Sequence, residues 1–186
     1  LNNLLDLSKL DVGKFPFNPQ KHNLSSIIKT SIDDVSGTAL ERNIAIRLIG
    51  FEKSILLDCD EEQINQIMRN LLGNALKFSE PASEIDIQLT MNNEMAEISV
   101  IDRGIGIPES ELEKIFAKFE QSSKTNSGAG GTGLGLAICR EFVALHQGTI
   151  TARNNEYGGA TILVKLPLRI DLPQHLANED RSVKLN

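Results

Sequence analysis

Half of the glycine residues in this chain lie in one short region. Seven of the 14 glycines fall between Gly104 and Gly135, in one group over 102–108 and another over 128–135. Glycine loses more conformational freedom on folding than other residues, so it gathers where the backbone approaches another group closely or adopts a positive φ angle. The fold must therefore accommodate tight backbone segments at two places, and this clustering is the first indication of a functional site.

Hydrophobic periodicity predicts the elements around these glycines. Apolar residues at helical spacing predict a helix that begins after Asn23 and further helices over 60–77, 109–116 and 134–146. Strands are predicted over 44–49, 54–58, 85–90, 97–101, 149–153 and 160–166. We expect the first two strands to pair with each other, and the next two to form a hairpin that turns at 92–94. This order predicts an α+β fold, a two-layer sandwich in which helices cover one face of a mixed β-sheet.

The two ends of the chain differ from the middle. The leucine-rich start has no capping signal, so residues 1–14 are predicted to be the end of a longer, truncated helix. Two prolines over 15–19 predict an extended connector, because proline disfavours helix in itself and in its predecessor. Residues 169–186 are polar and lack periodicity, which predicts a tail or linker. We therefore expect one domain over 15–168.

Composition excludes several classes of function. A formal net charge of −6 and 4% aromatic residues argue against a nucleic-acid partner, which requires a basic face or stacking platforms. Cys59 and Cys139 lie far apart, with no further ligand at metal-binding spacing. We expect two reduced thiols of a cytosolic protein and neither a disulfide framework nor a zinc site. No apolar run is long enough to predict a transmembrane helix.

The predicted helix over 60–77 has an unusual polar face. Asn70, Asn74 and Lys77 project within about 60° of one another at 3.6 residues per turn, and Gln63 and Gln66 continue this strip. An ordinary solvated face is one interpretation, but asparagine is a mediocre helix former that competes for backbone hydrogen bonds. An amide oxygen can ligate magnesium without adding negative charge beside a polyphosphate, and a lysine can contact a phosphate oxygen.

The first glycine group is Asp102-Arg-Gly-Ile-Gly-Ile-Pro108. An ordinary turn is one interpretation. A dinucleotide-binding fingerprint is disfavoured, because there the glycines open a long helix and here Pro108 intervenes. A carboxylate at the end of a strand, next to backbone without Cβ atoms, suits the exocyclic amine of a flat base. We therefore expect Asp102 to bind the amine of adenine.

The second glycine group, Gly128-Ala-Gly-Gly-Thr-Gly-Leu-Gly135, leads directly into a helix. Backbone N–H groups and the positive end of the helix dipole suit a phosphate at such a place. The group is not a P-loop, because no Lys-Ser/Thr pair follows its last glycine. A flexible linker is the alternative, although a linker seldom ends in a strongly apolar helix.

Four segments in this order resemble the sequence boxes of sensor histidine kinases. They are Asn70-Leu-Leu-Gly-Asn-Ala-Leu-Lys-Phe78, Asp102 to Pro108, Phe116-Ala-Lys-Phe119 and Gly131-Thr-Gly-Leu-Gly-Leu136. The resemblance covers about residues 1–168 and implies the Bergerat ATP-binding sandwich, which gyrase, mismatch-repair ATPases and a heat-shock chaperone share. It also implies that residues 1–14 are the end of the second dimerisation helix.

The resemblance implies roles for particular residues. Asn74 would bind Mg²⁺, Asn70 would help to orient metal or phosphates, and Lys77 would contact phosphate. The remaining ATP-binding residues would be Phe78, Asp102, Gly104, Gly106, Ile107, Gly131, Thr132, Gly133, Leu134, Gly135 and Thr161. Phe116 and Phe119 would anchor the near side of a lid over the nucleotide, although our interpretation of both as core residues stays open.

Two features of the sequence bear on the reaction. Hydrolysing members of the superfamily carry a glutamate one turn before the metal-binding asparagine, and this chain has Asn70 there. An amide cannot act as a general base, so we expect no efficient hydrolysis of ATP. The acceptor histidine of the kinases lies on the first dimerisation helix, and neither His22, His146 nor His175 fits that place. We expect His146 to make a favourable dipole contact at a helix end. Lys124 is interpreted either as a solvated lysine or as a contact to the γ-phosphate.

The sequence therefore predicts a protein histidine kinase catalytic domain that binds ATP and Mg²⁺. The acceptor histidine would lie on dimerisation helices absent from this chain, and a response-regulator receiver domain would act downstream. The resemblance further implies a homodimeric full-length protein with this domain in the cytoplasm, and leaves open whether that protein is anchored in a membrane. The alternative is a non-catalytic module that senses nucleotide, and a hydrolysing relative comes third.

Overall fold

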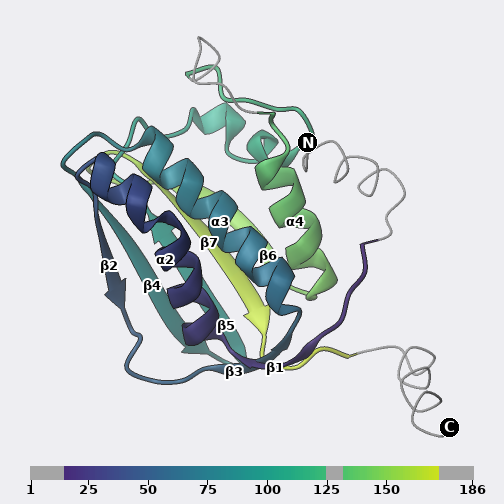
Figure 1. Ribbon diagram of the computed structural model, residues 1–186. Coiled ribbons are helices and arrows are strands. Elements are labelled where there is room, and N and C mark those ends of the chain that lie inside the picture. The colour runs from purple at the N-terminus through teal and green to yellow at the C-terminus, as the bar shows by residue number, and fades with distance from the viewer. Residues whose placement is uncertain (1–14, 125–131, 172–186) are drawn as a thin grey trace, which may run out of the picture.

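The structure is a computed structural model that describes residues 15–124 and 132–171. Three helices pack on one face of a five-stranded sheet (Figure 1). The helices are α2 (Leu24–Glu41), α3 (Glu61–Phe78) and α4 (Gly135–Leu145). The strands of this sheet, in spatial order, are β2 (Ala45–Ile49), β4 (Glu84–Asn92), β5 (Met95–Ile101), β7 (Ala160–Pro167) and β6 (Thr149–Asn154).

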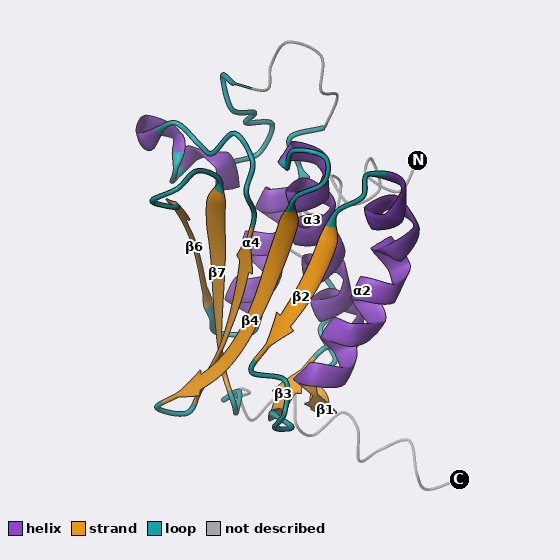
Figure 2. Ribbon diagram, turned by 90° about the vertical axis from the view of Figure 1, so that its left-hand side faces the viewer, coloured by secondary structure: helices purple, strands orange, loops and turns teal. Residues whose placement is uncertain are grey.

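The sheet is mixed. Strand β2 runs parallel to β4, and the pairs β4–β5, β5–β7 and β6–β7 are antiparallel. The helices lie on one side of the sheet and leave its other face uncovered by described elements (Figure 2). The predicted fold class, an α+β sandwich with helices on one face of a mixed sheet, is confirmed.

The predicted pairing of the strands near 44–49 and 54–58 is wrong. Strand β2 pairs with β4, whereas β3 (Leu56–Cys59) pairs antiparallel with β1 (Gln20–Asn23) in a separate two-stranded sheet. Strand β1 was not predicted, because its four polar residues have no strand pattern and owe their conformation to pairing with β3. The expected hairpin between β4 and β5 is present.

Helix α3 begins and ends within one residue of its prediction. The Asp60 carboxylate caps it by accepting a hydrogen bond from Gln63 N at 3.1 Å, and Glu61 and Glu62 lie favourably in its first turn. Its apolar stripe is buried: Ile64, Ile67, Met68, Leu71, Leu72, Ala75 and Leu76. The opposite, polar face of α3 is thereby held at a fixed orientation to the sheet.

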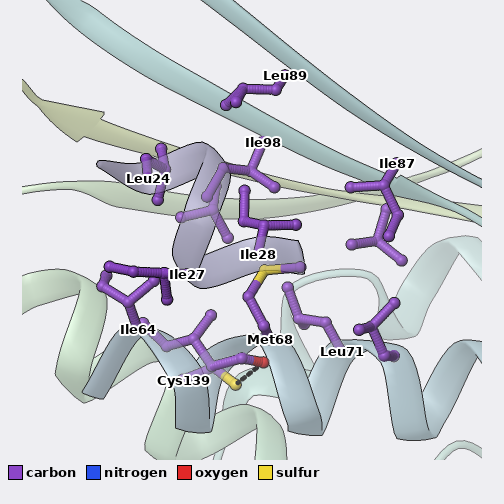
Figure 3. Packing of buried hydrophobic residues seen from close by; sticks show 14 of the residues in the cluster. Leu24, Ile27, Ile28, Ile64, Met68, Leu71, Ile87, Leu89, Ile98 and Cys139 are labelled. Atoms are coloured by element: carbon purple, nitrogen blue, oxygen red, sulfur yellow. Dashed lines mark hydrogen bonds between the residues drawn. The ribbon is translucent and has the colours of Figure 1, made fainter. Parts of the chain in front are cut away.

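The core lies between the helices and the sheet. Figure 3 shows Ile64, Met68 and Leu71 of α3 packed below the side chains of the sheet. The sheet contributes Ile87 and Leu89 of β4 and Ile98 of β5, each at most 1% exposed. Burial of this many apolar side chains, at roughly 1.5–3 kcal/mol each, provides the main stabilisation of the fold.

The segment after the first glycine group does not form the single helix expected over 109–116. It forms two 3₁₀-helices, η1 (Glu109–Glu111) and η2 (Lys114–Phe116). Their hydrogen bonds run between residues three apart, as from Glu111 N to Pro108 O at 2.8 Å and from Ala117 N to Lys114 O at 2.8 Å. A segment this short cannot offset the nucleation cost of an α-helix, so tighter turns replace it.

Residues 15–19 form the extended connector that the prolines predict, and it is attached to the helical layer. The Phe15 ring packs edge-on against Phe142 of α4, and the Gln63 side chain donates to the Pro16 carbonyl oxygen at 2.7 Å. The predictions for residues 1–14 and 172–186 lie outside the described residues. Among the helices of the described ranges, none is both long and apolar enough to span a membrane.

Candidate functional site

A cavity of about 400 Å³ lies between α3 and the two glycine groups. It gathers residues that are far apart in the sequence, from α3, the end of β5, the start of α4 and the start of β7. Of the residues predicted for the site, those on its wall are Asn70, Asn74, Lys77, Phe78, Asp102, Gly106, Ile107, Thr132, Gly133 and Gly135. The polar strip of α3 is therefore the wall of a cavity, and not a solvated face.

The middle of α3 contacts the second glycine group. Asn70 Nδ2 donates a hydrogen bond to the backbone oxygen of Gly135 at 3.1 Å. Gly135 is the first residue of α4, so this bond fixes the start of α4 against α3. Since the amide nitrogen is used in this way, the Asn70 oxygen is the atom that a ligand could use. The backbone N–H groups of the first turn of α4 have no intrahelical partners and suit an anion.

The C-terminal end of α3 contacts the first glycine group. A Cβ atom at position 104 would overlap the carbonyl oxygen of Phe78, so only glycine permits this approach. Ser79 and Gly104 form an isolated antiparallel bridge there. Phe78 lies eight residues after Asn70, which corresponds to about 12 Å along the helix axis. The two glycine groups therefore meet α3 at opposite ends of the cavity.

Asp102 places a carboxylate at the Phe78 end of the cavity. Its Oδ1 accepts hydrogen bonds from Gly104 N at 2.9 Å and from Ala160 N at 3.1 Å. Burial raises the pKa of this carboxyl, and the two backbone hydrogen bonds oppose the rise. With Oδ1 occupied by the backbone, Oδ2 is the oxygen that can accept a hydrogen bond from a ligand.

Lys77 lies beside the same end of the cavity. Its Nζ is 4.9 Å from the centre of the Phe78 ring, within the range of a cation–π contact. Asn74 lies between the two ends, one turn from both Asn70 and Phe78. The polar groups of α3 are thus distributed along the whole length of the cavity.

The last residue of the third box, Phe119, contacts Gly133 of the second glycine group. Phe119 N donates to the Gly133 oxygen at 3.0 Å. Gly133 has a φ angle of +68°, and a Cβ there would lie 2.7 Å from the Phe119 carbonyl carbon, so this contact requires glycine. Phe116 is a buried residue, as the core interpretation expects, whereas that interpretation is wrong for Phe119, which is 62% exposed.

Several residues predicted for the site are not on the cavity wall. Thr161 is buried on β7, where its hydroxyl donates to Asn155 Oδ1 at 2.6 Å, and its neighbours Ala160 and Ile162 line the cavity instead. Side chains alternate along a strand, so Thr161 faces away from the site. Gly104 and Leu134 lie behind the wall, because Gly104 packs on Phe78 and Leu134 is in the core.

Two further residues singled out in the sequence make contacts that were not predicted. Gln63 does not continue the polar strip, because its side chain is buried against Pro16. Lys124 is exposed and its Nζ donates to the Ile105 oxygen at 2.8 Å, so it contacts the first glycine group; its contact to the γ-phosphate stays a prediction. Gly131 lies outside the described residues.

The cavity also contains residues that the sequence did not reveal as part of it. Arg69 and Gly73 of α3 contribute to the wall, as do Ile105 and the three residues Glu120, Gln121 and Ser122. The last three follow Phe119 directly, so their position after the third box was the only available signal. Glu120 lies next to Gly133, since a Cβ at Gly133 would be 3.0 Å from the Glu120 oxygen.

The other candidate reactive groups are structural. Burial raises the pKa of the Cys59 and Cys139 thiols to about 12, so both are protonated. His146 is 1% exposed, accepts from Asp60 N at 3.0 Å through Nε2 and lies 2.7 Å from the Phe142 oxygen through Nδ1. Burial lowers the pKa of His146, which favours the neutral ring. Its Nδ1 contact to the Phe142 oxygen lies at the C-terminal end of α4, where a contact with the helix end is expected, and Nε2 joins α4 to the start of α3.

Comparison with known proteins gives a consistent result. The model of the family described as histidine kinase-, DNA gyrase B- and HSP90-like ATPase matches residues 59–170. The sensor histidine kinase WalK of Bacillus subtilis is 35% identical over 91% of this chain. The hybrid signal transduction histidine kinase D of Dictyostelium discoideum is 34% identical over 95% of it. This chain spans only 28% and 12% of the lengths of these two proteins.

Solved structures resemble the fold over most of the chain. The catalytic domain of the histidine kinase ThkA, in a nucleotide-free form, matches with a TM-score of 0.73 and 28% identity over 82% of this chain and 97% of its own. Full-length ShkA in complex with AMPPNP has a TM-score of 0.79 over 92% of this chain and 36% of its own. Its identity of 23% supports the fold alone.

Proposed function

The chain belongs to the histidine kinase-, DNA gyrase B- and HSP90-like ATPase family, as the ATP-binding catalytic domain of a sensor histidine kinase, and from this we propose how it works. We propose that its cavity holds Mg-ATP with the base beside Asp102 and the triphosphate towards Asn70. The domain would comprise residues 15–168, since Phe15 and Leu168 both pack against the core. One observation carries the proposal: the two glycine groups meet the middle and the C-terminal end of α3, at opposite ends of one cavity.

The chemistry of the Asp102 end supports a base with an amino group. Asp102 Oδ2 is an acceptor at the wall of a partly apolar pocket, to which Val100, Ile105 and Ile107 contribute. An amine can donate to this oxygen, whereas a carbonyl oxygen at the same place would be repelled by it. Adenine therefore fits this end, and guanine does not.

The opposite end supports the phosphates. The start of α4 offers N–H groups and a positive dipole end, and Thr132 and Gly133 lie next to it on the wall. A closed metal cage of protein carboxylates is not available, because the described residues contain no cluster of three His, Cys, Asp or Glu side chains suited to a metal ion.

Magnesium fits this donor set, because Mg²⁺ typically takes one or two protein oxygens and completes its shell with phosphate oxygens and waters. The amide oxygens of Asn74 and Asn70 would hold the ion. When bound, it would neutralise phosphate charge during phosphoryl transfer. The protein residues would bind and orient the nucleotide, with Lys77 as a further positive charge.

We propose that the γ-phosphoryl group passes to a histidine of another segment, and not to water. The carboxylate that would activate water is replaced at position 70 by an amide, whose nitrogen is already bonded to Gly135. The acceptor would lie on the dimerisation helices of the full-length protein, which would be a homodimer and would pass the phosphoryl group to a receiver domain. The domain would act in the cytoplasm.

The metal assignment is tested by Asn74→Ala. We expect calorimetry to show at least a tenfold loss of ATP affinity with Mg²⁺, from the loss of one metal ligand, and a smaller loss in EDTA. Asn92→Ala, at an exposed end of β4, is the matched control and should bind as the wild type does. Equal losses with and without Mg²⁺ would count against the assignment.

The transfer reaction is tested by mixing the full chain with a separate dimerisation domain of a histidine kinase and γ-labelled ATP. We expect an acid-labile label on histidine of the added domain and little release of free phosphate. Tight ATP binding without transfer to the domains of several relatives would favour the alternative, a non-catalytic nucleotide sensor.

A further inference from the structure

The turn between β6 and β7 holds the first glycine group from the side of the sheet. Asp102 N donates to the Ala160 oxygen at 2.9 Å, and Asn155 Nδ2 donates to the Asp102 oxygen at 2.9 Å. Asn154 binds the other end of the group: its Oδ1 accepts from Ile107 N at 2.8 Å, and its Nδ2 donates to the Ile107 oxygen at 2.7 Å. Two successive asparagines thus hold both ends of one loop.

The contact between Asn154 and Ile107 has a specific chemistry. One side-chain amide satisfies both the donor and the acceptor of the Ile107 residue, as a neighbouring strand would do. Aspartate has the same size but lacks the donor, and leucine lacks both groups. Asn154 is the last residue of β6, so the strand places its amide at the correct height below the loop.

The Ile107 end of the loop depends on this contact. The Asp102 end has additional anchors, since Arg103 forms an ion pair with Glu84 at 2.8 Å and Gly104 pairs with Ser79. At the other end, both hydrogen bonds of the Ile107 backbone within the described residues go to Asn154. Lys124 also contacts the loop, at the Ile105 oxygen, and the loop has no helix or strand of its own over 105–107. The position of Ile107 on the cavity wall therefore depends on Asn154.

We propose that Asn154 is a positioning residue that fixes Ile107 and thereby sets the base selectivity of the cavity. This inference rests on the proposed function, because it takes the base to lie between Asp102 and the Ile107 wall. Asn154 is not among the residues that line the cavity, so it acts through the Ile107 backbone. If the wall moves, the base can tilt and its amine loses alignment with Asp102. The phosphate end, held by Asn70 and α4, does not change.

The test compares ATP with inosine triphosphate, whose base has a carbonyl in place of the amine. For Asn154→Ala we expect about a tenfold loss of ATP affinity by calorimetry, corresponding to one hydrogen bond of roughly 1–1.5 kcal/mol. Inosine triphosphate should lose about twofold or less, so the ratio of the two affinities falls. Arg153→Ala is the matched control, because Arg153 is adjacent and exposed on the opposite face of β6.

A double-mutant cycle tests whether Asn154 acts through Ile107. Ile107→Ala should lower the same ratio, and adding Asn154→Ala to it should have little further effect, because both changes remove the same wall. If Asn154→Ala does not fold, Asn154→Asp gives the same comparison, since it keeps the size and loses the donor to the Ile107 oxygen.

The outcomes separate the two proposals. Equal losses for ATP and inosine triphosphate, an unchanged ratio, or additive effects in the cycle would overturn the role of Asn154. Failure of the wild-type chain to bind either nucleotide would instead overturn the proposed function itself. A general loss of stability alone cannot imitate the expected result, because it does not alter the ratio of two affinities measured on folded protein.

Discussion

Asp102→Asn should weaken ATP binding without weakening the fold. The asparagine oxygen can still accept the hydrogen bonds that Gly104 N and Ala160 N give to Asp102 Oδ1. The new amide nitrogen takes the place of Oδ2, so a donor faces the amine of the base where an acceptor faced it before. The substitution therefore removes one interaction with the ligand and keeps the local hydrogen bonds of the protein.

The magnitude follows from the charge of the lost acceptor. A hydrogen bond to a charged group contributes about 1.5–3 kcal/mol, which corresponds to about a ten- to hundredfold rise in the Kd for ATP. Removing a negative charge near a polyanion acts in the opposite direction, but more weakly across solvent. Asp33→Asn, on the exposed side of α2 and not on the cavity wall, makes the same change of net charge and is the control for it.

The same substitution should leave the free energy of unfolding unchanged or raise it, although it weakens ATP binding. Because burial raises the pKa of Asp102, the folded protein binds a proton there more readily than the unfolded chain does. Its ionised form therefore disfavours folding at neutral pH, and this cost is absent below the ordinary carboxyl pKa of about 4. We expect Asp102→Asn to unfold in urea at the same or a higher midpoint than the wild type at pH 7. The difference should shrink as the pH falls through the folded pKa towards 4.

Calorimetry with ATP and with purine riboside triphosphate, which has no amine, completes the test. The asparagine variant should bind both nucleotides with similar affinity, whereas the wild type should prefer ATP. If both proteins show the same preference, Asp102 does not bind the amine, and the orientation of the nucleotide in the cavity has to be revised.

Two further predictions concern the fold around the cavity. Gly104→Ala should lower the thermal midpoint and weaken ATP binding, because its methyl group overlaps the Phe78 oxygen. Gly37 lies in α2, where an added Cβ would meet no atom within 4 Å. Gly37→Ala should therefore raise the unfolding free energy by about 0.5–1 kcal/mol. Unchanged midpoints in both variants would contradict this account. Burial lowers the pKa of His146 in the folded protein, so the unfolded chain binds a proton at this residue more readily. As the pH falls below the ordinary histidine pKa of about 6.5, the free energy of unfolding should therefore decrease, until the pH reaches the lower pKa of the folded state. Urea titrations between pH 7 and pH 5 should show that loss in the wild type and less of it in His146→Gln; equal slopes would argue against a buried neutral ring.

Local signals in the sequence were sufficient for the helix that carries the site. The apolar stripe of α3, its aspartate cap and its asparagines all lie within one segment, so periodicity alone placed Asn70 and Asn74 on one face. The glycine groups could be predicted for the same reason, because glycine itself indicates a place where the backbone approaches another group closely.

Non-local pairing limited the prediction elsewhere. The short link between β2 and β3 imitates a hairpin, but β2 finds its parallel partner β4 more than 30 residues later, where no local pattern indicates it. Thr161 carries a role implied by the resemblance, but its side chain lies on the opposite face of β7 from the wall residues Ala160 and Ile162, and the pairing of β7 with the distant β5 is not visible in its local sequence. Asn154 and Asn155 look like ordinary residues before a glycine turn, and only their contacts across the sheet reveal their partners.

The hydrogen bond between Phe119 and Gly133 has a consequence for how this chain can vary. Because Phe119 and Gly133 are joined there, the entropic cost of connecting them along the chain grows only with the logarithm of the number of residues between them. Changes in the length of the chain before the second glycine group can therefore leave Gly133, Gly135 and the start of α4 in place against Asn70.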